Sequence, residues 1–424
     1  MAMTRVNRPH QSIYRASQTG ETADCPALCH KKAGRILRDP ISRHDIDHVV
    51  LMDLRIADLA AASAFLWTLI ALLPWQPWRV GESLDAKPSV PLEDLADVTV
   101  LIPARNESRV ITQTLTELAL QGPGLRIIVI DDESTDNTAA AARAIPLPQL
   151  TIISGTTPPS GWTGKLWALE QGRREVTTPK VLLLDADIAL DNGIVAALHR
   201  KMDQEHLQLV SLMAAPSMNS VWERLLMPAF VYFFKLLYPF RLSNSRSPVV
   251  AAAAGGCLLV EARVLTEIGG FAAIRGALID DCSLARSVKA AGHRTWIGLS
   301  HSARMVRHNG FVDIWRMVTR TAYTQLRYSV TLLLLCVVIL TLAFIVPVAG
   351  LFASRESAAF STVALALMAL SYRPVLGFYG LSRVWTFSLP LAGTLYLAMT
   401  LASALRRRSR WRGRDYPRTA NGTS

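Results

Sequence analysis

The sequence lacks several features that would assign it quickly to a known class of protein. Its five cysteines, at positions 25, 29, 257, 282 and 336, form no disulfide framework. Residues 25–30 contain Cys, Cys and His, but no second ligand pair follows, as a zinc site would require. No basic segment leads directly into an apolar core near the start, so we expect no standard secretory signal peptide.

Two glycine patterns that bind phosphate are also missing. No G-x-G-x-x-G follows the first predicted strand, which argues against a dinucleotide oxidoreductase. The loop at residues 161–165, Gly-Trp-Thr-Gly-Lys, is not a Walker A loop, because its two glycines are too close together. Its lysine, Lys165, still suits a phosphate group.

Hydrophobic residues, by contrast, are abundant and concentrated in a few runs. They make up 50% of the 424 residues, and the mean hydropathy is +0.25. We therefore predict a membrane protein that carries a soluble domain. The net charge is +12, and residues 406–424 supply half of it with seven Arg and one Asp. This concentration favours an anionic lipid surface over a nucleic acid as the partner.

The composition changes along the chain and predicts five segments. Residues 1–50 are polar, basic and without periodicity, so we expect a disordered extension. Residues 55–77 contain an apolar run long enough for a transmembrane helix. Residues 95–310 alternate apolar runs with polar helical stretches. Residues 329–405 form a C-terminal membrane region, and a basic tail follows at 406–424.

The alternating segment predicts an α/β domain. We expect strands at residues 98–102, 125–130, 151–154 and 181–184, with helices at 107–119 and 135–144 and another from 165 to 172. Strands and helices in alternation indicate a mostly parallel sheet with helices on both faces. In such sheets the ligand lies beyond the carboxyl ends of the strands.

The stretch at residues 181–187, Val-Leu-Leu-Leu-Asp-Ala-Asp, stands at the centre of this pattern. Its apolar run predicts a buried strand, and Asp185 and Asp187 follow where the chain leaves the sheet. Carboxylate oxygens suit Mg²⁺ or Mn²⁺, which can in turn hold a diphosphate. The simpler interpretation is that the two acids only cap a helix or form a turn.

Two further polar clusters follow predicted strands. Pro103, Arg105 and Glu107 come after the first strand and open a helix whose N-terminus favours polar ligands. Asp132 belongs to the cluster after the second strand, where acids can accept hydrogen bonds from ribose or base. For the later residues of that cluster, 134–137, the simpler interpretation is that they cap the next helix, because Ser, Thr, Asp and Asn are the usual capping residues.

Acidic and basic residues also occur further along the chain. Asp280 and Asp281 lead a helix that we expect to end at Gly292. They either balance the helix dipole or face a pocket, where one can serve as a general base. Gln325 and Arg327 precede the first C-terminal apolar block. Arg327 can hold a diphosphate, or it can simply mark the membrane border.

The membrane segments leave the topology open. Residues 221–240 favour a helix in the membrane interface, with a buried helix or a dimer face as the alternative. The C-terminal region has apolar blocks at 329–353, 358–371 and 387–405. If the sheet domain is cytoplasmic and all three blocks cross, the basic tail ends outside, against the positive-inside rule. We therefore expect one block to be re-entrant or interfacial.

The order of these motifs resembles that of family 2 glycosyltransferases with the GT-A fold, over residues 95–405. The motifs are VLIPARNE, IDDESTDNT, GWTGK, DAD, a Gly-Gly-Cys segment, an Asp-Asp pair and QLRY before a span. The GWTGKLWALEQG and QLRYS stretches and the WRGRDY tail further resemble a bacterial group associated with hopanoid biosynthesis.

The resemblance implies a role for each matching residue. Pro103, Glu107 and Asp132 would form the nucleoside pocket, and Asp185 and Asp187 the metal motif. Gly255 and Gly256 would line the sugar and acceptor side, and Asp281 would be the catalytic base. Two positions depart from the family pattern: Asp280 replaces the usual Glu, so it competes for the role of base, and Gln-x-x-Arg-Trp is contracted to Gln325-x-Arg327-Tyr328.

The resemblance also implies an activity. It is the inverting transfer of a sugar from a nucleotide sugar, most often a UDP-sugar, with Mg²⁺ or Mn²⁺. The membrane segments point to a lipid acceptor, with a hopanoid as the leading candidate. The expected location is the bacterial inner membrane, with several crossings and a cytoplasmic catalytic domain, and we expect no nucleic-acid partner. The alternatives are a processive polysaccharide synthase, which needs an intact Gln-x-x-Arg-Trp motif, and a non-catalytic membrane scaffold, which needs none of these acids.

Overall fold

The computed structural model describes residues 43–87, 92–406, 408–411 and 414–417. The cysteine–histidine segment at 25–30 and most of the extension expected at 1–50 lie outside these residues. The chain divides into two units, residues 1–48 and 49–424, and the second is described below. Helix α1 spans Arg43–Leu72, so helical structure begins earlier than the sequence indicated.

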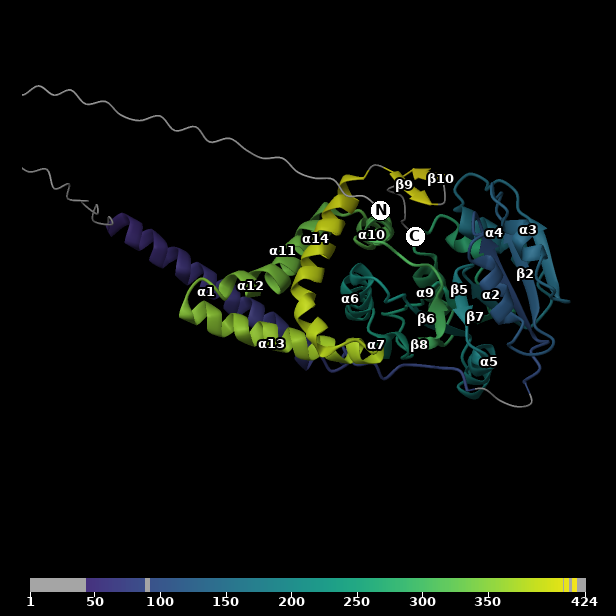
Figure 1. The fold of residues 1–424 in the computed structure, drawn as a ribbon, viewed down its shortest axis with the longest axis horizontal. Helices are drawn as coiled ribbons and strands as arrows, with labels where there is room; N and C mark the ends of the chain where they lie inside the picture. The colour runs from purple at the N-terminus through teal and green to yellow at the C-terminus, as the bar shows by residue number, and fades with distance from the viewer. Residues whose placement is uncertain (1–42, 88–91, 407, 412–413, 418–424) are drawn as a thin grey trace, which may run out of the picture. The chain divides into compact units, whose positions relative to one another are not determined.

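An eight-stranded mixed sheet forms the centre of the domain (Figure 1). The strand order is β3-β2-β1-β4-β7-β6-β8-β5. The first four neighbours, β3, β2, β1 and β4, are parallel as predicted, whereas β7 runs antiparallel to both β4 and β6. The strands are β1 Val98–Ala104, β2 Arg126–Asp131, β3 Leu150–Ser154, β4 Lys180–Leu184, β5 Ile188–Leu190, β6 Leu209–Ala215, β7 Cys257–Glu261 and β8 Thr295–Met305.

Helices cover both faces of this sheet because the buried strands are apolar on both sides. In β4, Leu182 and Leu184 join one hydrophobic core, and Val181 and Leu183 join the other. The first core includes residues of α2 (Ile111–Leu118) and α5 (Ile194–Gln204). The second includes residues of α4 (Gly164–Arg173) and α9 (Asp280–Ala290). Shorter helices near the sheet include α3 Thr138–Arg143, α7 Phe240–Ser243 and α8 Ala262–Glu267.

Helix α2 begins at Ile111 and not at Glu107 as predicted. Asn106 has a left-handed backbone conformation with φ of 54°, which a continuing helix does not allow. Its Oδ1 accepts a hydrogen bond from the Thr135 backbone N–H at 2.8 Å, and the Glu107 N–H donates to Thr138 Oγ1 at 2.8 Å. Hydrogen bonds therefore join the loops after β1 and β2, and α2 begins only after these contacts.

In the described part of the chain, four helical segments are long and apolar enough to cross a membrane: residues 55–72, 330–350, 355–378 and 383–405. The second consists of α11 Val330–Leu340, a π-helical turn Thr341–Ile345 (η2) and α12 Val346–Gly350. The third is α13 Arg355–Phe378, which is longer than the block at 358–371 that the sequence suggested. The fourth is η3 Arg383–Ser388 with α14 Leu389–Leu405. In the tail, β9 Arg408–Trp411 and β10 Arg414–Pro417 pair as an antiparallel hairpin.

Contacts with the sheet domain lie just before the fourth segment and near its end. The carbonyl of Phe378, at the end of α13, lies 2.6 Å from His301 Nε2 on β8. Near the end of α14, Ser403 Oγ accepts a hydrogen bond from the Tyr323 N–H at 3.0 Å. Tyr323 belongs to α10 (Phe311–Gln325), beside which α14 ends in Figure 1. The stretch from Phe378 to Ser403 therefore begins and ends beside the sheet domain.

Helix α6 (Val221–Leu237) is a buried helix, so the preferred prediction of an interfacial helix is wrong for most of its length. Its inward residues share one hydrophobic core with α1, α13 and α14. Tyr232 OH pairs with Ser371 Oγ of α13 at 2.8 Å, and Tyr396 OH of α14 donates to the Leu226 carbonyl at 2.9 Å. The aromatic residues that suggested a lipid surface contact other helices instead.

Candidate active site

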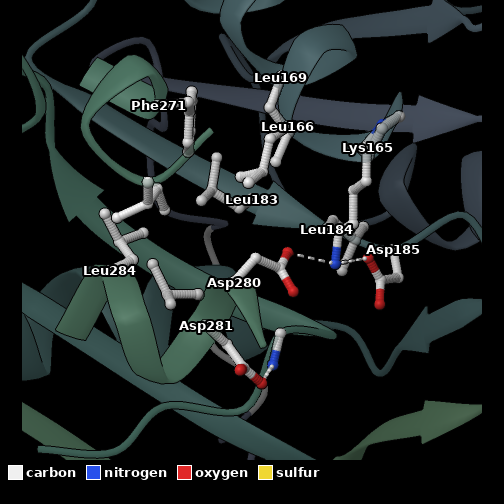
Figure 2. A pocket seen from close by; sticks show the side chains of 14 residues that line it. Lys165, Leu166, Leu169, Leu183, Leu184, Asp185, Phe271, Asp280, Asp281 and Leu284 are labelled. Carbon is white, nitrogen blue, oxygen red and sulfur yellow. Dashed lines mark hydrogen bonds and ion pairs between the residues drawn. The ribbon is translucent and has the colours of Figure 1, made fainter. Parts of the chain in front are cut away.

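A pocket opens at the carboxyl end of β4, where the chain leaves the sheet. Figure 2 shows Lys165 between Asp185 and Asp280, with Asp281 just beyond. The rest of the wall is mostly apolar. The lining consists of Pro103, Lys165, Leu166, Leu169, Leu183, Leu184, Asp185, Gly255, Leu258, Phe271, Ile274, Asp280, Asp281 and Leu284. Six of the residues selected from the sequence thus meet in one cavity.

Lys165 connects the two acidic motifs. It lies in the first turn of α4, and its Nζ is 2.8 Å from Asp185 Oδ1 and 3.1 Å from Asp280 Oδ2. Burial acts to lower the pKa of Lys165, but the carboxylates of Asp185 and Asp280 outweigh it and the net shift is upward. The ammonium therefore stays charged at neutral pH, in a pocket where an anionic ligand would otherwise meet carboxylates.

Asp281 occupies the first turn of α9, and backbone groups fix both of its oxygens. Oδ2 accepts a hydrogen bond from the Gly255 N–H at 2.8 Å, and Oδ1 accepts one from the Cys282 N–H at 2.7 Å. Burial and the neighbouring Asp280 carboxylate raise the pKa of Asp281 to about 6, against the opposing effects of these bonds and Lys165. Such a carboxylate is ionised at pH 7 yet more basic than usual, which suits proton abstraction.

Gly255 lies where an added Cβ atom would crowd the charged side chains of the pocket. A Cβ atom there would lie 3.3 Å from Asp281 Oδ2 and 3.4 Å from Lys165 Nζ. The neighbouring Gly256 accepts a hydrogen bond from the Asp185 N–H at 3.1 Å. The two glycines therefore join the exit of β4 to the start of α9 and leave the backbone close to both charged groups.

Asp187 lies on the other side of Asp185, paired with an arginine that the sequence analysis did not select. Arg307 Nε is 3.1 Å from Asp187 Oδ2, and its Nη2 bonds Glu107 Oε2. Arg307 follows β8, more than 100 residues away in the sequence, and no local motif marks it. Only the pairing of β8 with β5 brings it to the exit of β4.

The carboxylates around the pocket are of the type that a divalent cation prefers. Glu107, Asp185, Asp187, Asp280 and Asp281 are five carboxylates beside two cationic side chains, Lys165 and Arg307. This leaves an excess of negative charge with oxygen ligands, which fits Mg²⁺ or Mn²⁺. Within the described residues no group of three or more His, Cys, Asp or Glu is arranged as a complete metal site, so the remaining ligands would come from water or a bound diphosphate.

The residues expected around the nucleoside hold the loops after β1 and β2. Asp132 is buried, and its N–H donates to the Ala104 carbonyl at 2.8 Å. Arg105 Nη1 donates to the carbonyl oxygens of Asp132 and Glu133, the latter at 3.1 Å. Pro103 faces the pocket directly. Arg105 and Asp132 do not line the pocket themselves but hold the loops that follow β1 and β2.

The predicted pair Gln325 and Arg327 does not line the pocket. Gln325 Oε1 accepts a hydrogen bond from Tyr238 OH at 2.7 Å. Burial raises the pKa of Tyr238, with the Cys282 thiol and Asp281 carboxylate adding to it, so Gln325 lies one side chain away from the Asp281 region. Arg327 is exposed and has φ of 50°. The structure thus brings Gln325, through Tyr238, closer to the site than Arg327.

Comparisons with known proteins agree with this geometry. The family model described as "Glycosyltransferase like family 2" matches residues 96–324, more than half of the chain. A 4,4'-diaponeurosporenoate glycosyltransferase of Staphylococcus haemolyticus is 30% identical over 125 residues, covering 28% of this chain and 32% of that protein. Its counterpart in Staphylococcus aureus strain USA300 is 34% identical over 91 residues, 22% of this chain and 24% of that one. The chain thus matches a third or less of the length of these relatives.

Solved structures give more distant similarities. The mannosyltransferase PcManGT from Pyrobaculum calidifontis, in complex with GDP-Man and Mn²⁺, has a TM-score of 0.49 and 17% identity. The match covers 82% of this chain and 99% of that one. The glucosyl-3-phosphoglycerate synthase from Mycobacterium tuberculosis, solved with Mn²⁺, UDP and phosphoglyceric acid, has a TM-score of 0.37 and 14% identity, covering 58% and 86%.

Proposed function

The chain belongs to the glycosyltransferase-like family 2 and has a GT-A domain, and on that premise we propose that it transfers a sugar from a nucleotide sugar to a lipid acceptor with inversion. The observation that carries the proposal is the juxtaposition of Lys165 and Asp281. A partly buried ammonium between Asp185 and Asp280 lies beside a carboxylate with a raised pKa. The first can neutralise a leaving diphosphate, and the second can accept a proton.

The proposed reaction is a single displacement. Asp281 accepts the proton of the acceptor hydroxyl as its oxygen bonds to the anomeric carbon of the sugar. On the opposite face the bond between that carbon and the diphosphate oxygen breaks, and the nucleoside diphosphate leaves with the electron pair. One base suffices, unlike a retaining route through a covalent intermediate. The Gly255 and Cys282 N–H groups keep Asp281 fixed in orientation.

Other residues have roles in binding the donor. We assign Pro103, Arg105, Glu107 and Asp132 to the nucleoside side, with a UDP-sugar as the leading donor. Asp187 and Asp185 would hold a divalent cation, which when bound supplies positive charge to the diphosphate. Lys165 adds charge of its own at the same place. Gly255 and Gly256 leave room for the sugar and acceptor, and Gln325 supports Tyr238 at the acceptor side.

The proposed acceptor is a membrane lipid. The four apolar segments support an acceptor that resides in a membrane. A hopanoid is the first candidate by motif resemblance. A diaponeurosporenoate-type acceptor is the second, since the curated relatives carry that name.

We also propose a topology with three crossings, formed by α1, α11–α12 and α13. The contacts Phe378–His301 and Ser403–Tyr323 place both ends of the fourth segment beside the sheet domain. They support a segment that runs alongside this domain and does not cross the membrane. Among the four segments it has the largest buried share. The catalytic domain and the basic tail then lie on the same side, which the positive-inside rule assigns to the cytoplasm of a bacterial inner membrane.

The test is transfer by the purified, detergent-held chain. It is incubated with a panel of nucleotide sugars, a lipid extract and Mg²⁺ or Mn²⁺. We expect one sugar to reach a lipid, and Asp281→Asn to lower the rate by a factor of about 100 to 10,000. The matched control is Asp191→Asn, an acid paired with Arg304 outside the pocket. The absence of nucleotide-sugar binding or turnover with either metal would leave the scaffold alternative standing.

A further inference from the structure

Arg307 is fixed in place from both sides along the chain. On one side, the Val306 N–H donates to the Asp187 carbonyl at 2.8 Å. On the other, the Asn309 N–H donates to Glu223 Oε1 at 2.8 Å. Glu223 is itself buried and closes the capping box at the start of α6 with Ser220. The backbone at Arg307 is therefore anchored to the strand exit and to a helix end, so its position beside Asp187 is built into the fold.

The side chain of Arg307 bridges two groups with different expected roles. Its Nε contacts Asp187, a candidate metal ligand, and its Nη2 contacts Glu107, on the nucleoside side. The side chains of Arg307, Asp187 and Glu107 are 32%, 19% and 9% exposed, so the bridge is largely shielded from water. Partly buried pairs of this kind have much stronger effects than surface pairs.

A divalent cation held by Asp187 would lie close to the Arg307 guanidinium, whose Nε is 3.1 Å from Asp187 Oδ2, and the two positive charges would repel each other. We propose that Arg307 is an internal counter-cation of the donor site, which competes with the metal for Asp187 and then binds the donor diphosphate. A guanidinium presents a planar fork of N–H donors that matches phosphate oxygens, so a released Arg307 is suited to that second role. This inference rests on the proposed donor site and adds a sequence of contacts: Arg307 first pairs with Asp187 and then, once the metal binds, contacts the donor diphosphate.

The proposal predicts opposite changes in two affinities. In Arg307→Gln, Mn²⁺ binding without nucleotide becomes at least about fivefold tighter, because the competing cation is gone. UDP binding at saturating Mn²⁺ becomes at least about fivefold weaker, because a phosphate ligand is gone. A substitution that only loosened the site would weaken both. Mn²⁺ binding is followed by electron paramagnetic resonance and UDP binding by calorimetry, on the full chain in detergent.

Arg304→Gln is the matched control. Arg304 lies three residues earlier and pairs with Asp191 at 2.8 Å, outside the pocket. Both affinities should remain at their wild-type values in this variant. Unchanged or weaker Mn²⁺ binding in folded Arg307→Gln overturns the proposal. If Arg307→Gln does not fold, Arg307→Lys is tested instead. Lysine keeps the positive charge but lacks the planar fork of N–H donors, so we expect weaker UDP binding and no tightening of Mn²⁺ binding. Unchanged UDP binding in this variant overturns the proposal.

These measurements do not depend on turnover. If wild-type protein transfers sugar but Arg307→Gln leaves Mn²⁺ affinity unchanged, the inference fails and the proposed function stands. If no sugar is transferred to any acceptor but the two affinities shift in opposite directions, the inference stands and the transferase proposal fails. The two failures are therefore distinguishable in one set of purified proteins.

Discussion

At the scale of single residues, the proposed role of Asp281 as the base gives a prediction for the pH dependence of the rate. Its pKa is raised to about 6, first by burial and then by Asp280. We expect kcat/KM for the acceptor to rise with pH through about 6 and then level off, because only the carboxylate accepts a proton. The measurement is transfer rate from pH 5 to 8 at saturating donor. A rate that is flat below pH 6 would contradict the assignment of Asp281 as the base.

The same shift gives a prediction for stability. A carboxyl group whose folded pKa is raised stabilises the fold only while protonated, so its contribution is complete below the unfolded value near 3.8 and is lost as pH rises through about 6. Asp281→Asn is neutral like the protonated form, and its one amide oxygen keeps one of the two backbone hydrogen bonds, from Gly255 or from Cys282. We expect its melting temperature to exceed that of the wild type at pH 7.5, with the difference shrinking toward pH 4.5.

Melting curves in detergent at both pH values check this prediction. Asp191→Asn serves as the control, since it lies outside the pocket. A lower melting temperature of Asp281→Asn at pH 7.5 would mean that the carboxylate stabilises the fold. In that case Asp281 would be a structural cap of α9.

The sequence identified most of the acidic residues in the site, because they directly follow apolar strands or open a helix. Asp185 and Asp281 could be selected in this way. Arg307 and Tyr238 could not, since each is a single residue in a segment without a motif, and each reaches the site only through long-range packing. A lone arginine after a strand has no local signal of function.

At the scale of elements, helix α6 shows how burial constrains a charged residue. Lys235 is 1% exposed, and its Nζ lies 3.3 Å from Glu82 Oε2 and 3.9 Å from the centre of the Phe240 ring. Removing one partner of such a pair leaves a buried charge, whereas an apolar replacement of similar size is often neutral. The pair thus connects α6 to the segment that follows α1.

We expect Glu82→Gln to destabilise the fold by about 3 kcal/mol, because the Lys235 ammonium loses its charged partner. Lys235→Met should be no less stable than the wild type, because Glu82 is partly exposed and can be hydrated. Unfolding in detergent, followed by intrinsic fluorescence, ranks the free energies of unfolding of the two variants and the wild type. Equal stability of Glu82→Gln and the wild type would show that the pair contributes nothing.

The sequence predicted α6 as a helix but assigned its apolar face to the membrane interface. Amphipathic helices bury that face against lipid or protein in the same way, so composition alone does not separate the two. The structure places α13 and α14 against α6: a serine hydroxyl of α13 pairs with the Tyr232 hydroxyl, and the Tyr396 hydroxyl of α14 donates to the Leu226 carbonyl. The element was predictable and its partner was not.

At the scale of the whole molecule, the number of crossings determines where the basic tail lies. With three crossings, the turn at Ser354 is on the opposite side of the membrane from the catalytic domain, and Ser409 is on the same side. In a background without native cysteines, we expect Ser354→Cys to react with an impermeant maleimide in intact cells. Ser409→Cys should react only after the membrane is permeabilised. Labelling of Ser409→Cys in intact cells would show that the fourth segment crosses.

By itself, the sequence determined the local features of this protein. Apolar runs that end in acids predicted the strands and the acids at their ends, and the long apolar blocks predicted helices long enough to cross a membrane, because both features depend on neighbouring residues. The direction of β7, the position of Arg307 and the course of α14 were decided only by the tertiary structure. Each depends on contacts between residues far apart in the chain, and no local pattern encodes such contacts.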